Sequence, residues 1–348
     1  MVPVGDEQPR AGRVHGSRHP GQDDAGSDAS RHAAPVDSCP LCGGTDGSRV
    51  AAVPYHVIWN GLRELWHVHL SSEVIRRHES SSQAILVECA ECGLEYFAGA
   101  IPGDSEFYEC VMGNIAYHAD RWEFGIVVPR VRTGAAVVDL GCGDGAFLRR
   151  AASRAGRLVG VDHNVDAIRA LAETGLEGST EPFGEFARRE QGAFDVVCTF
   201  HTLEHLRDAR TAIYAAKALL RPGGRFFASV PNRSRYGQHD DEPLDCPPHH
   251  VSRWSARQFQ EIATRFELDL VSVHTEDPDL SHARLAAAEG SRMLERFGAL
   301  DGERLPARLW MRAALGRRRH DRAIARGEYQ HRGVFGHSIL AELRVPAG

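Results

Sequence analysis

The sequence has few features that point to a membrane protein, a secreted protein or a nucleic-acid binder. No apolar run approaches the ~20 residues of a membrane span. The first residues contain no apolar signal-peptide core, so we expect no secretory signal and a cytoplasmic location. The 41 Lys and Arg residues are outnumbered by 47 Asp and Glu residues, so no general basic field attracts RNA, DNA or anionic lipid. We therefore expect neither nucleic acid nor a membrane as a partner.

Large apolar residues are almost missing from residues 1–36, which are rich in Gly, Asp, Ser, Arg and His. Such a segment cannot bury enough apolar surface to offset the entropy of ordering, so its composition predicts a disordered arm. The rest of the 348-residue chain is long enough for one large domain and a smaller one. We expect the smaller domain at residues 37–110 and the larger one at residues 111–348.

Cysteine is not abundant either, but four of the eight cysteines form two Cys-x-x-Cys pairs. Each pair is followed by glycine, which permits a left-handed backbone after a short turn. Two such turns supply four thiolates, the ligand set of a closed, structural zinc site. The predicted ligands are Cys39, Cys42, Cys89 and Cys92. The alternative is two unrelated pairs of reduced thiols.

The stretch between the two cysteine pairs is too long for a compact zinc ribbon, so an insertion must lie there. Apolar and aromatic residues recur at helical spacing from Tyr55 to His69, which predicts an amphipathic helix. Four histidines of this region are expected at the surface rather than at the metal: His56, His67, His69 and His78.

A strand, a glycine-rich loop and a helix follow one another at Val137–Leu148. Gly141 and Gly143 allow a sharp turn and let a ligand approach the backbone. With Ala146 they also satisfy the Gly-x-Gly-x-x-Gly/Ala fingerprint of dinucleotide-binding folds. A second strand ends at Asp162, at about the 20-residue spacing where a carboxylate accepts ribose hydroxyls. These features fit both NAD and S-adenosylmethionine.

Four motifs together are more specific than the glycines alone. They are Asp139–Gly145, Val161–Asp162, Phe194–His205 and Leu220–Arg225. In order and spacing they resemble the motifs of class I S-adenosylmethionine-dependent methyltransferases. Many bacterial members of that superfamily are similar in carrying two Cys-x-x-Cys pairs ahead of the catalytic domain. A nicotinamide-binding fold remains the structural alternative.

The alternation of strand and helix patterns predicts an α/β fold with a doubly wound, Rossmann-like sheet of seven mostly parallel strands. The resemblance implies that the last strand is antiparallel. A helical pattern at about 281–332 predicts an insertion before that strand. The expected strands lie near 136–140, 157–162, 176–180, 194–200, 224–231, 267–275 and 337–345.

The resemblance also implies how the cofactor is bound. Asp139 lies near the methionine ammonium, Gly141 and Gly143 admit the ligand, and Asp162 receives the ribose hydroxyls. Glu181 follows the third strand, where such enzymes contact adenine; Asp162 has an alternative role as a helix N-cap. The expected cofactor-binding residues are Asp139, Gly141, Cys142, Gly143, Asp162, His163, Glu181 and Phe200.

The stretch His201-Thr-Leu-Glu-His205 reads as an inverted zinc-protease motif, which needs both histidines on one helix. Because a strand is predicted up to Phe200, His201 is instead expected at the carboxyl end of that strand, where ligands bind in open sheets. His205 has the alternative of capping the next helix. A later loop with two prolines carries His249 and His250, our first choices for a general base, with a solvated loop histidine as the alternative. The candidate catalytic residues are therefore His201, His249 and His250.

Two further segments carry weaker signals. An aromatic-rich segment before the first parallel strand makes Tyr117 and Trp122 candidates for a lid over the site, or for ordinary packing. Nine arginines at Arg304–Arg332 form either a basic surface for a phosphorylated acceptor or a solvated helix face.

The reaction implied by the resemblance is in-line attack of an acceptor on an activated sulfonium methyl group, with catalysis mostly by positioning. The expected acceptor is a small molecule, or a sugar, glycan or natural-product intermediate, methylated at oxygen, nitrogen or carbon. One alternative is an RNA methyltransferase with a zinc module, which the acidic balance disfavours. The other is a non-catalytic zinc-dependent binding module, which the intact glycine loop disfavours.

Overall fold

A computed structural model of the protein describes residues 38–112, 121–235, 242–276 and 336–347. All described residues belong to one compact unit, which spans residues 35–348. The predicted arm at 1–36, Tyr117, the helical insertion at 281–332 and the arginine-rich segment lie outside the described residues. Among the helices of the described part, none is long and apolar enough to cross a bilayer.

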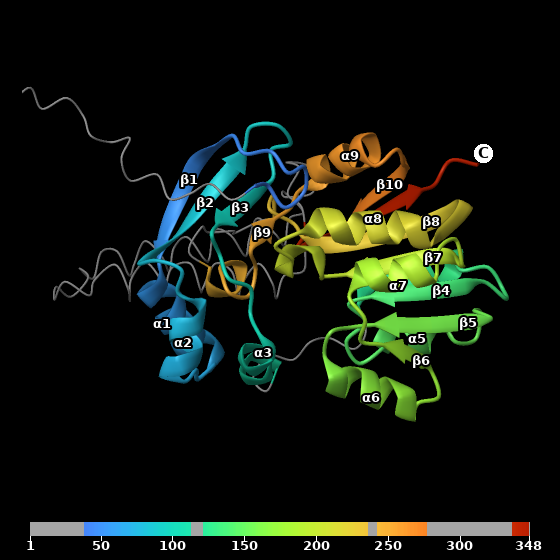
Figure 1. The fold of residues 1–348 in the computed structure, drawn as a ribbon, viewed down its shortest axis with the longest axis horizontal. Coiled ribbons are helices and arrows are strands. Elements are labelled where there is room, and N and C mark those ends of the chain that lie inside the picture. Colours follow the sequence, from blue (N-terminus) through green and yellow to red (C-terminus); the bar gives the residue numbers. More distant parts are fainter. Residues whose placement is uncertain (1–37, 113–120, 236–241, 277–335, 348) are drawn as a thin grey trace, which may run out of the picture. The chain divides into compact units, whose positions relative to one another are not determined.

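A seven-stranded sheet forms the centre of the larger domain, with strand order β10-β11-β8-β7-β4-β5-β6 (Figure 1). The pairs β4–β5, β4–β7, β5–β6 and β7–β8 are parallel, whereas β11 is antiparallel to both β8 and β10. The predicted fold class is therefore confirmed, including the antiparallel last strand. The strands are β4 (Ala136–Leu140), β5 (Arg157–Val161), β6 (Glu177–Ser179), β7 (Phe194–Phe200), β8 (Leu220–Pro231), β10 (Asp269–Thr275) and β11 (Ser338–Arg344).

Helices cover both faces of this sheet, because successive strand residues point to opposite sides. Val138 of β4 belongs to the core that α7, α8 and α9 cover, and its neighbour Val137 belongs to the core under α4 and α5. Figure 1 shows α7 and α8 on the viewer's side of the sheet. The helices are α4 (Trp122–Val127), α5 (Ala146–Ala151), α6 (Val165–Glu173), α7 (Phe183–Arg189), α8 (Ala209–Leu219) and α9 (Ala256–Arg265), with short 3-10 turns η1 (Val128–Arg130), η2 (Leu203–His205) and η3 (Pro243–Asp245).

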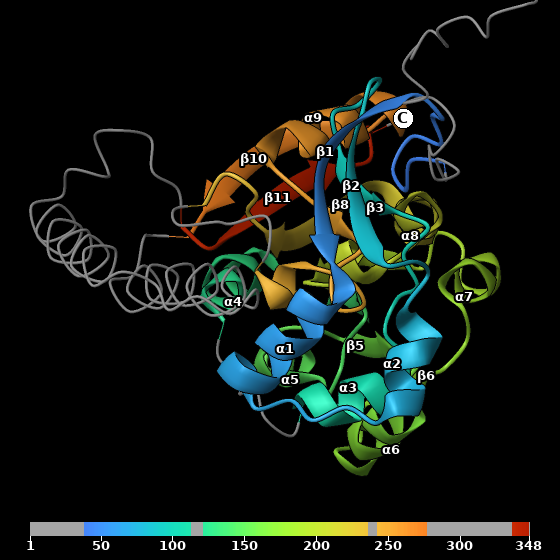
Figure 2. The ribbon, with the colours of Figure 1, turned by 90° about the vertical axis from the view of Figure 1, so that its left-hand side faces the viewer.

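A four-stranded antiparallel sheet of order β1-β2-β3-β9 forms the smaller module (Figure 2). Its strands are β1 (Gly47–Pro54), β2 (Gln83–Cys89), β3 (Glu95–Ala98) and β9 (Ser252–Arg253). Strand β9 comes from the loop region after β8, so this sheet takes one strand from outside residues 37–110. The boundary between the two domains near residue 110 stays a prediction.

Helices α1 (Tyr55–Trp66) and α2 (Ser72–His78) lie between β1 and β2, and α3 (Ser105–Met112) follows β3. The predicted amphipathic helix begins at Tyr55 as expected and ends at Trp66, because His67 takes a left-handed backbone conformation with φ of 55°. The insertion between the cysteine pairs therefore consists of two helices that connect strands β1 and β2 of the small sheet.

The expected surface position of His78 is wrong. Its ring is buried: Nδ1 lies 2.7 Å from the Val74 carbonyl oxygen, and Nε2 accepts a hydrogen bond from the Asp104 backbone N–H at 3.2 Å. The ring also packs against Phe107, with centroids 5.8 Å apart. Because both nitrogens are satisfied by backbone groups, burial costs this polar ring little. His56, His67 and His69 are exposed, as predicted.

Candidate functional site

The glycine-rich loop after β4 has the left-handed backbone that its sequence predicts. Gly141, Gly143 and Gly145 have φ values of 79°, 51° and 78°. A Cβ on Gly141 would overlap the Thr202 hydroxyl, whereas a Cβ on Gly143 would meet no heavy atom within 4 Å. The protein itself therefore requires glycine at position 141. At position 143 the space beside the backbone is open to a ligand.

Asp162 follows β5 and holds this loop. Its Oδ2 accepts a hydrogen bond from the Gly143 N–H at 2.9 Å, and its Oδ1 accepts one from the Asn164 N–H at 2.9 Å. The N-cap of α6 is Asn164, whose side chain accepts from two backbone N–H groups. The alternative role of Asp162 as a helix N-cap is therefore wrong. His163 is largely exposed, with Nδ1 3.5 Å from Asp162 Oδ1.

Asp139 is the buried acid at the end of β4, and its Oδ1 has no hydrogen-bond partner. Burial and the nearby Asp162 carboxylate raise the pKa of Asp139 to about 8. A buried, unsatisfied carboxylate oxygen is costly unless a ligand completes it. An ammonium group meets that requirement, so the residues present fit the methionine end of S-adenosylmethionine.

Two other expected cofactor-binding residues, Cys142 and Phe200, are packed against neighbouring protein groups. Burial raises the pKa of the Cys142 thiol, which fills the space beside Gly160 beneath the loop. Phe200 at the end of β7 packs its ring against Phe124 and Phe147, with centroids 5.1 and 4.8 Å away. Both side chains belong to the apolar core under α4 and α5.

Glu181 is already held by other protein groups. Its Oε2 accepts hydrogen bonds from Arg189 Nη2 at 2.7 Å and Ser179 Oγ at 3.0 Å. The Arg189 guanidinium lowers the pKa of this exposed carboxyl. No local sequence pattern indicated this partner, because Arg189 lies eight residues further on, at the end of α7.

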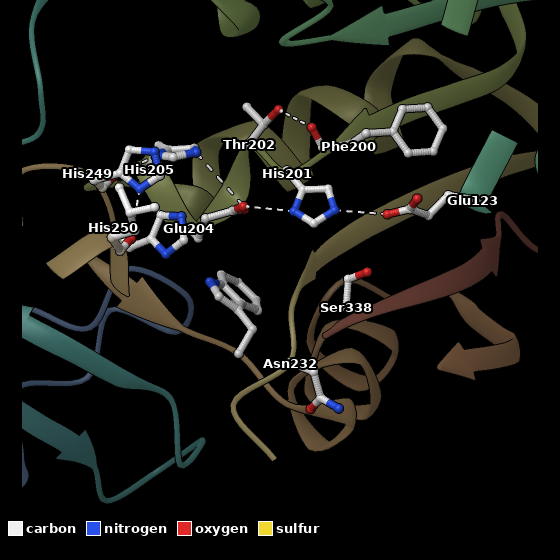
Figure 3. A network of polar contacts seen from close by, with 12 residues as sticks. Glu123, Phe200, His201, Thr202, Glu204, His205, Asn232, His249, His250 and Ser338 are labelled. Atoms are coloured by element: carbon white, nitrogen blue, oxygen red, sulfur yellow. Dashed lines mark hydrogen bonds and ion pairs between the residues drawn. The ribbon is translucent and has the colours of Figure 1, made fainter. Parts of the chain in front are cut away.

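His201 joins two buried glutamates immediately after β7 (Figure 3). Its Nε2 lies 2.9 Å from Glu123 Oε1, and its Nδ1 lies 3.5 Å from Glu204 Oε1. Burial opposes the imidazolium, but the hydrogen bonds to Glu123 and Glu204 raise the pKa of His201. Burial likewise opposes the two carboxylates, while His201 lowers the pKa of each. The result is a buried charged triad.

Glu123 was not predicted as a site residue. It belongs to α4, the segment before the first parallel strand, and its hydrogen bond ties that segment to the end of β7. Its neighbour Trp122 donates from Nε1 to Ser338 Oγ of β11 at 2.8 Å. The lid candidate of this segment is therefore anchored on the sheet. In the sequence, Glu123 is an isolated glutamate among aromatic residues, and nothing around it indicates that it pairs with His201.

The two histidines of the inverted protease motif belong to different networks. His205 lies in the 3-10 turn η2, and His201 precedes that turn. They are not on one helix, as we expected, so the metalloprotease arrangement is absent from this described segment. The N-cap of α8 is Asp208, which accepts from the Thr211 N–H. The alternative of His205 as a helix cap is therefore wrong.

His205, His249 and His250 instead form a cluster (Figure 3). The ring centroids of His249 and His250 are 4.4 Å apart, and each lies 4.9 Å from that of His205. Burial lowers the pKa of His205 to about 4 and that of His249 well below its usual value. Tyr108 of α3 lies against the cluster, with its hydroxyl 2.9 Å from His205 Nδ1.

Asp245 orients this cluster through its contact with His250. Its Oδ1 lies 3.0 Å from His250 Nδ1, and its Oδ2 lies 3.2 Å from Arg253 Nε and 3.6 Å from Arg235 Nη2. Burial opposes ionisation, but the two guanidinium groups hold the pKa of Asp245 far below its usual range. The loop histidines are thus fixed by a buried ionic network rather than solvated.

The four predicted metal-ligating cysteines converge on one point. Cys39 Sγ lies 3.5 Å from Cys92 Sγ, Cys42 Sγ lies 3.5 Å from Cys89 Sγ, and all four sulfurs lie within 4.8 Å of one another. The glycine after each pair is left-handed, as expected. Ligands on a tetrahedral zinc ion with Zn–S bonds of about 2.3 Å are about 3.8 Å apart. The cluster therefore fits zinc, and the two pairs are not unrelated turns.

This cysteine cluster is attached to the larger domain. Gln258 of α9 donates from Nε2 to the Cys92 carbonyl oxygen at 3.1 Å, and the Arg210 N–H of α8 donates to the Pro40 carbonyl oxygen at 2.9 Å. Cys39, Cys89 and Cys92 also belong to the apolar core that α8 and α9 cover. The small module is therefore packed against the sheet rather than linked by a flexible connection.

Comparison with known proteins finds similarity over the segment that forms most of the parallel sheet. A family model described as "Methyltransferase domain" matches residues 124–273. The ubiquinone biosynthesis O-methyltransferase of Cupriavidus pinatubonensis is 35% identical over 107 residues, which are 29% of this chain and 43% of that protein. The enzyme of the same name from Cronobacter sakazakii is 32% identical over 107 residues, 29% of this chain and 44% of that protein.

The aligned part thus spans less than half the length of these curated relatives. A solved structure, a SAM dependent methyltransferase from Archaeoglobus fulgidus, has a TM-score of 0.45 at 16% identity and covers 64% of this chain and 91% of that one. Residues 124–273 match a methyltransferase domain, which supports the predicted class I S-adenosylmethionine-dependent methyltransferase resemblance over the nicotinamide-binding alternative.

Proposed function

We propose that the protein transfers a methyl group from S-adenosylmethionine to a small-molecule acceptor, with sugars and natural products as the first classes to test. The observation that carries the proposal is the unsatisfied Asp139 oxygen beside the open backbone of Gly143 and the Asp162 carboxylate. The relatives named as O-methyltransferases favour an oxygen acceptor.

The chain's own groups bind and position the reactants. S-adenosylmethionine, when bound, supplies an activated sulfonium methyl group. Asp139 receives the ammonium, the open side of Gly143 admits the ligand, and Asp162 offers its carboxylate to the ribose hydroxyls. Phe200 contributes to the apolar core under α4 and α5. Because the methyl group is already activated, precise placement of the acceptor supplies most of the rate enhancement.

A base is needed only where the acceptor must lose a proton. His201 faces a carboxylate with each ring nitrogen, so its role is to hold α4 against the end of β7. His249 and His250 are the remaining candidates, and Asp245 orients His250 as a third group orients a catalytic base. Loss of such a base lowers turnover by about 100-fold or more.

The four cysteines hold a structural zinc ion in this proposal. Their sulfur geometry supports it, and a closed four-sulfur site leaves no position for chemistry. The ion fixes the two turns that contact α8 and α9.

A methyl-transfer assay tests the proposal. Purified protein is incubated with S-adenosylmethionine labelled in its methyl group and a panel of phenols, hydroxylated natural products and nucleotide sugars. Transfer of label to one acceptor class, lost in Asp139→Asn and retained in Asp166→Asn on the exposed face of α6, supports it. Transfer that survives equally in both variants contradicts the assigned cofactor site.

A further inference from the structure

The three-histidine cluster has a geometry that base catalysis does not explain. His205 comes from η2, whereas His249 and His250 come from the loop before β9. Each residue offers one nitrogen, and the three nitrogens lie within 4.8 Å of one another. This cluster shares no residue with the four-cysteine site.

The hydrogen bonds of the cluster fix which nitrogen of each ring carries the proton. His205 Nδ1 lies 2.6 Å from the His249 carbonyl oxygen, and His249 Nδ1 lies 2.8 Å from the Leu244 carbonyl oxygen. His250 Nδ1 lies 3.0 Å from the ionised Asp245 carboxylate. These carbonyl and carboxylate oxygens accept, so each Nδ1 donates, and the Nε2 atom of each ring is the one left for a ligand.

This is the pattern of metal-ligating histidines. Such residues donate their second ring N–H to a carbonyl or carboxylate, which fixes the ring and leaves the other nitrogen to the metal. A general base needs only one histidine oriented in this way, whereas three such histidines lie side by side here.

Glu204 links the cluster to His201. Its side chain is 1% exposed, and its Oε1 lies 3.5 Å from His201 Nδ1. The same Oε1 lies 3.9 Å from His205 Nε2, and Figure 3 shows Glu204 between His201 and His205. The buried carboxylate thus places negative charge next to the histidine cluster, which favours a cation there.

We infer that His205, His249 and His250 bind a divalent transition-metal ion through their Nε2 atoms. Imidazole ligands suit zinc first among the common ions, and sites with three histidines keep a fourth position for water or another oxygen ligand. Metal coordination and proton uptake exclude each other at the same nitrogen, so a bound metal removes His249 and His250 as bases.

Metal counting tests the inference on the full-length protein. The protein is loaded with zinc, dialysed, and analysed by plasma mass spectrometry before and after treatment with a mercurial reagent that attacks thiolates. We expect two zinc ions per chain, one released by the reagent from the cysteines and one retained. The double variant His249→Ala/His250→Ala loses the retained ion, whereas His69→Ala, an exposed histidine of the small module, keeps both.

The metal-counting experiment is decisive even if the double variant does not fold. In the wild-type protein alone, a retained zinc ion supports the inference, and complete release by the thiol reagent overturns it. A retained ion that persists in a folded double variant also overturns it. No cofactor or acceptor is present in this experiment, so its failure leaves the methyltransferase proposal untouched.

Discussion

The Nε2 atom of His201 lies 2.9 Å from Oε1 of Glu123, which joins the end of β7 to a helix that precedes the first parallel strand. His201 adopts a left-handed backbone conformation with φ of 52°, which costs about 1–2 kcal/mol for a residue with a side chain. The paired carboxylates on both ring nitrogens offset that cost. This contact fixes α4 against the edge of the sheet where the cofactor is proposed to bind.

Breaking this pair should destabilise the protein in a pH-dependent way. Because the pKa of His201 is raised above its ordinary 6.5, the pair's contribution to the free energy of unfolding is full below that value and is lost as pH rises through the folded-state pKa. Glu123, with a lowered pKa, sets the acid limit, since its contribution disappears as pH falls through its own folded-state pKa. We expect Glu123→Gln to lower the free energy of unfolding by about 3 kcal/mol at pH 6.

Urea denaturation at several pH values measures this effect. The matched control is Glu185→Gln, an exposed glutamate of α7 whose ion pair with Arg188 is 3.8 Å long. The loss in Glu123→Gln should shrink above the folded-state pKa of His201. A loss that is equal at all pH values, or equal in the control, would show that the His201 pair is not its source.

The open backbone at Gly143 predicts a specific loss of cofactor affinity. In Gly143→Ala the new methyl group meets no protein atom but enters the space left for the ligand. Gly192→Ala is the matched control, because Gly192 also has positive φ and open space but lies in the turn before β7. Both variants should lose about 1 kcal/mol of stability from the left-handed backbone. Only Gly143→Ala should weaken S-adenosylhomocysteine binding, by tenfold or more, and equal affinities would contradict the placement of the ligand.

The raised pKa of Asp139 predicts that cofactor binding releases a proton. With a pKa of about 8, this carboxyl is largely protonated at pH 7, and an arriving ammonium favours the ionised form. Affinity for S-adenosylmethionine should therefore increase as pH rises from 6 to 8. Calorimetry in buffers of different ionisation enthalpy measures the released proton. Asp139→Asn should abolish both the proton release and the pH dependence, and persistence of either would assign it to another group.

We expect the cysteine site to stabilise the larger domain as well as the small sheet. We expect Cys92→Ser to lose the thiol-bound zinc and to lower the unfolding free energy by several kcal/mol, because the turn that carries Cys92 also contacts Gln258 of α9. Cys110→Ser, at a half-buried cysteine of α3, should leave metal content and stability nearly unchanged. Equal metal content in the two variants would remove the zinc assignment.

Most strands of the large sheet could be predicted from the sequence because they are short apolar runs with their own turn signals, whereas β6 is a polar stretch of three residues. The run of Val137 to Leu140 and the glycines after it specify the strand and the loop without help from distant residues. The convergence of Cys39 and Cys92 could likewise be predicted from the spacing of the two cysteine pairs. Local chemistry decides these features.

The features that were missed depend on tertiary contacts. The two-residue strand β9 exists only because Tyr96 of β3 lies opposite Ser252. His78 is buried because a helix turn and a distant loop each satisfy one of its nitrogens. Glu123 acquires its role only when α4 reaches the end of β7. No local pattern in the sequence carries information of this kind.

The most direct test of the account is calorimetric titration of the metal-quantified protein with S-adenosylmethionine, S-adenosylhomocysteine and NAD. We predict saturable binding of both sulfur compounds and no heat from NAD, with the sulfur-compound binding lost in Asp162→Ala. Binding of NAD alone would contradict the account and return the glycine loop to a nicotinamide-dependent enzyme.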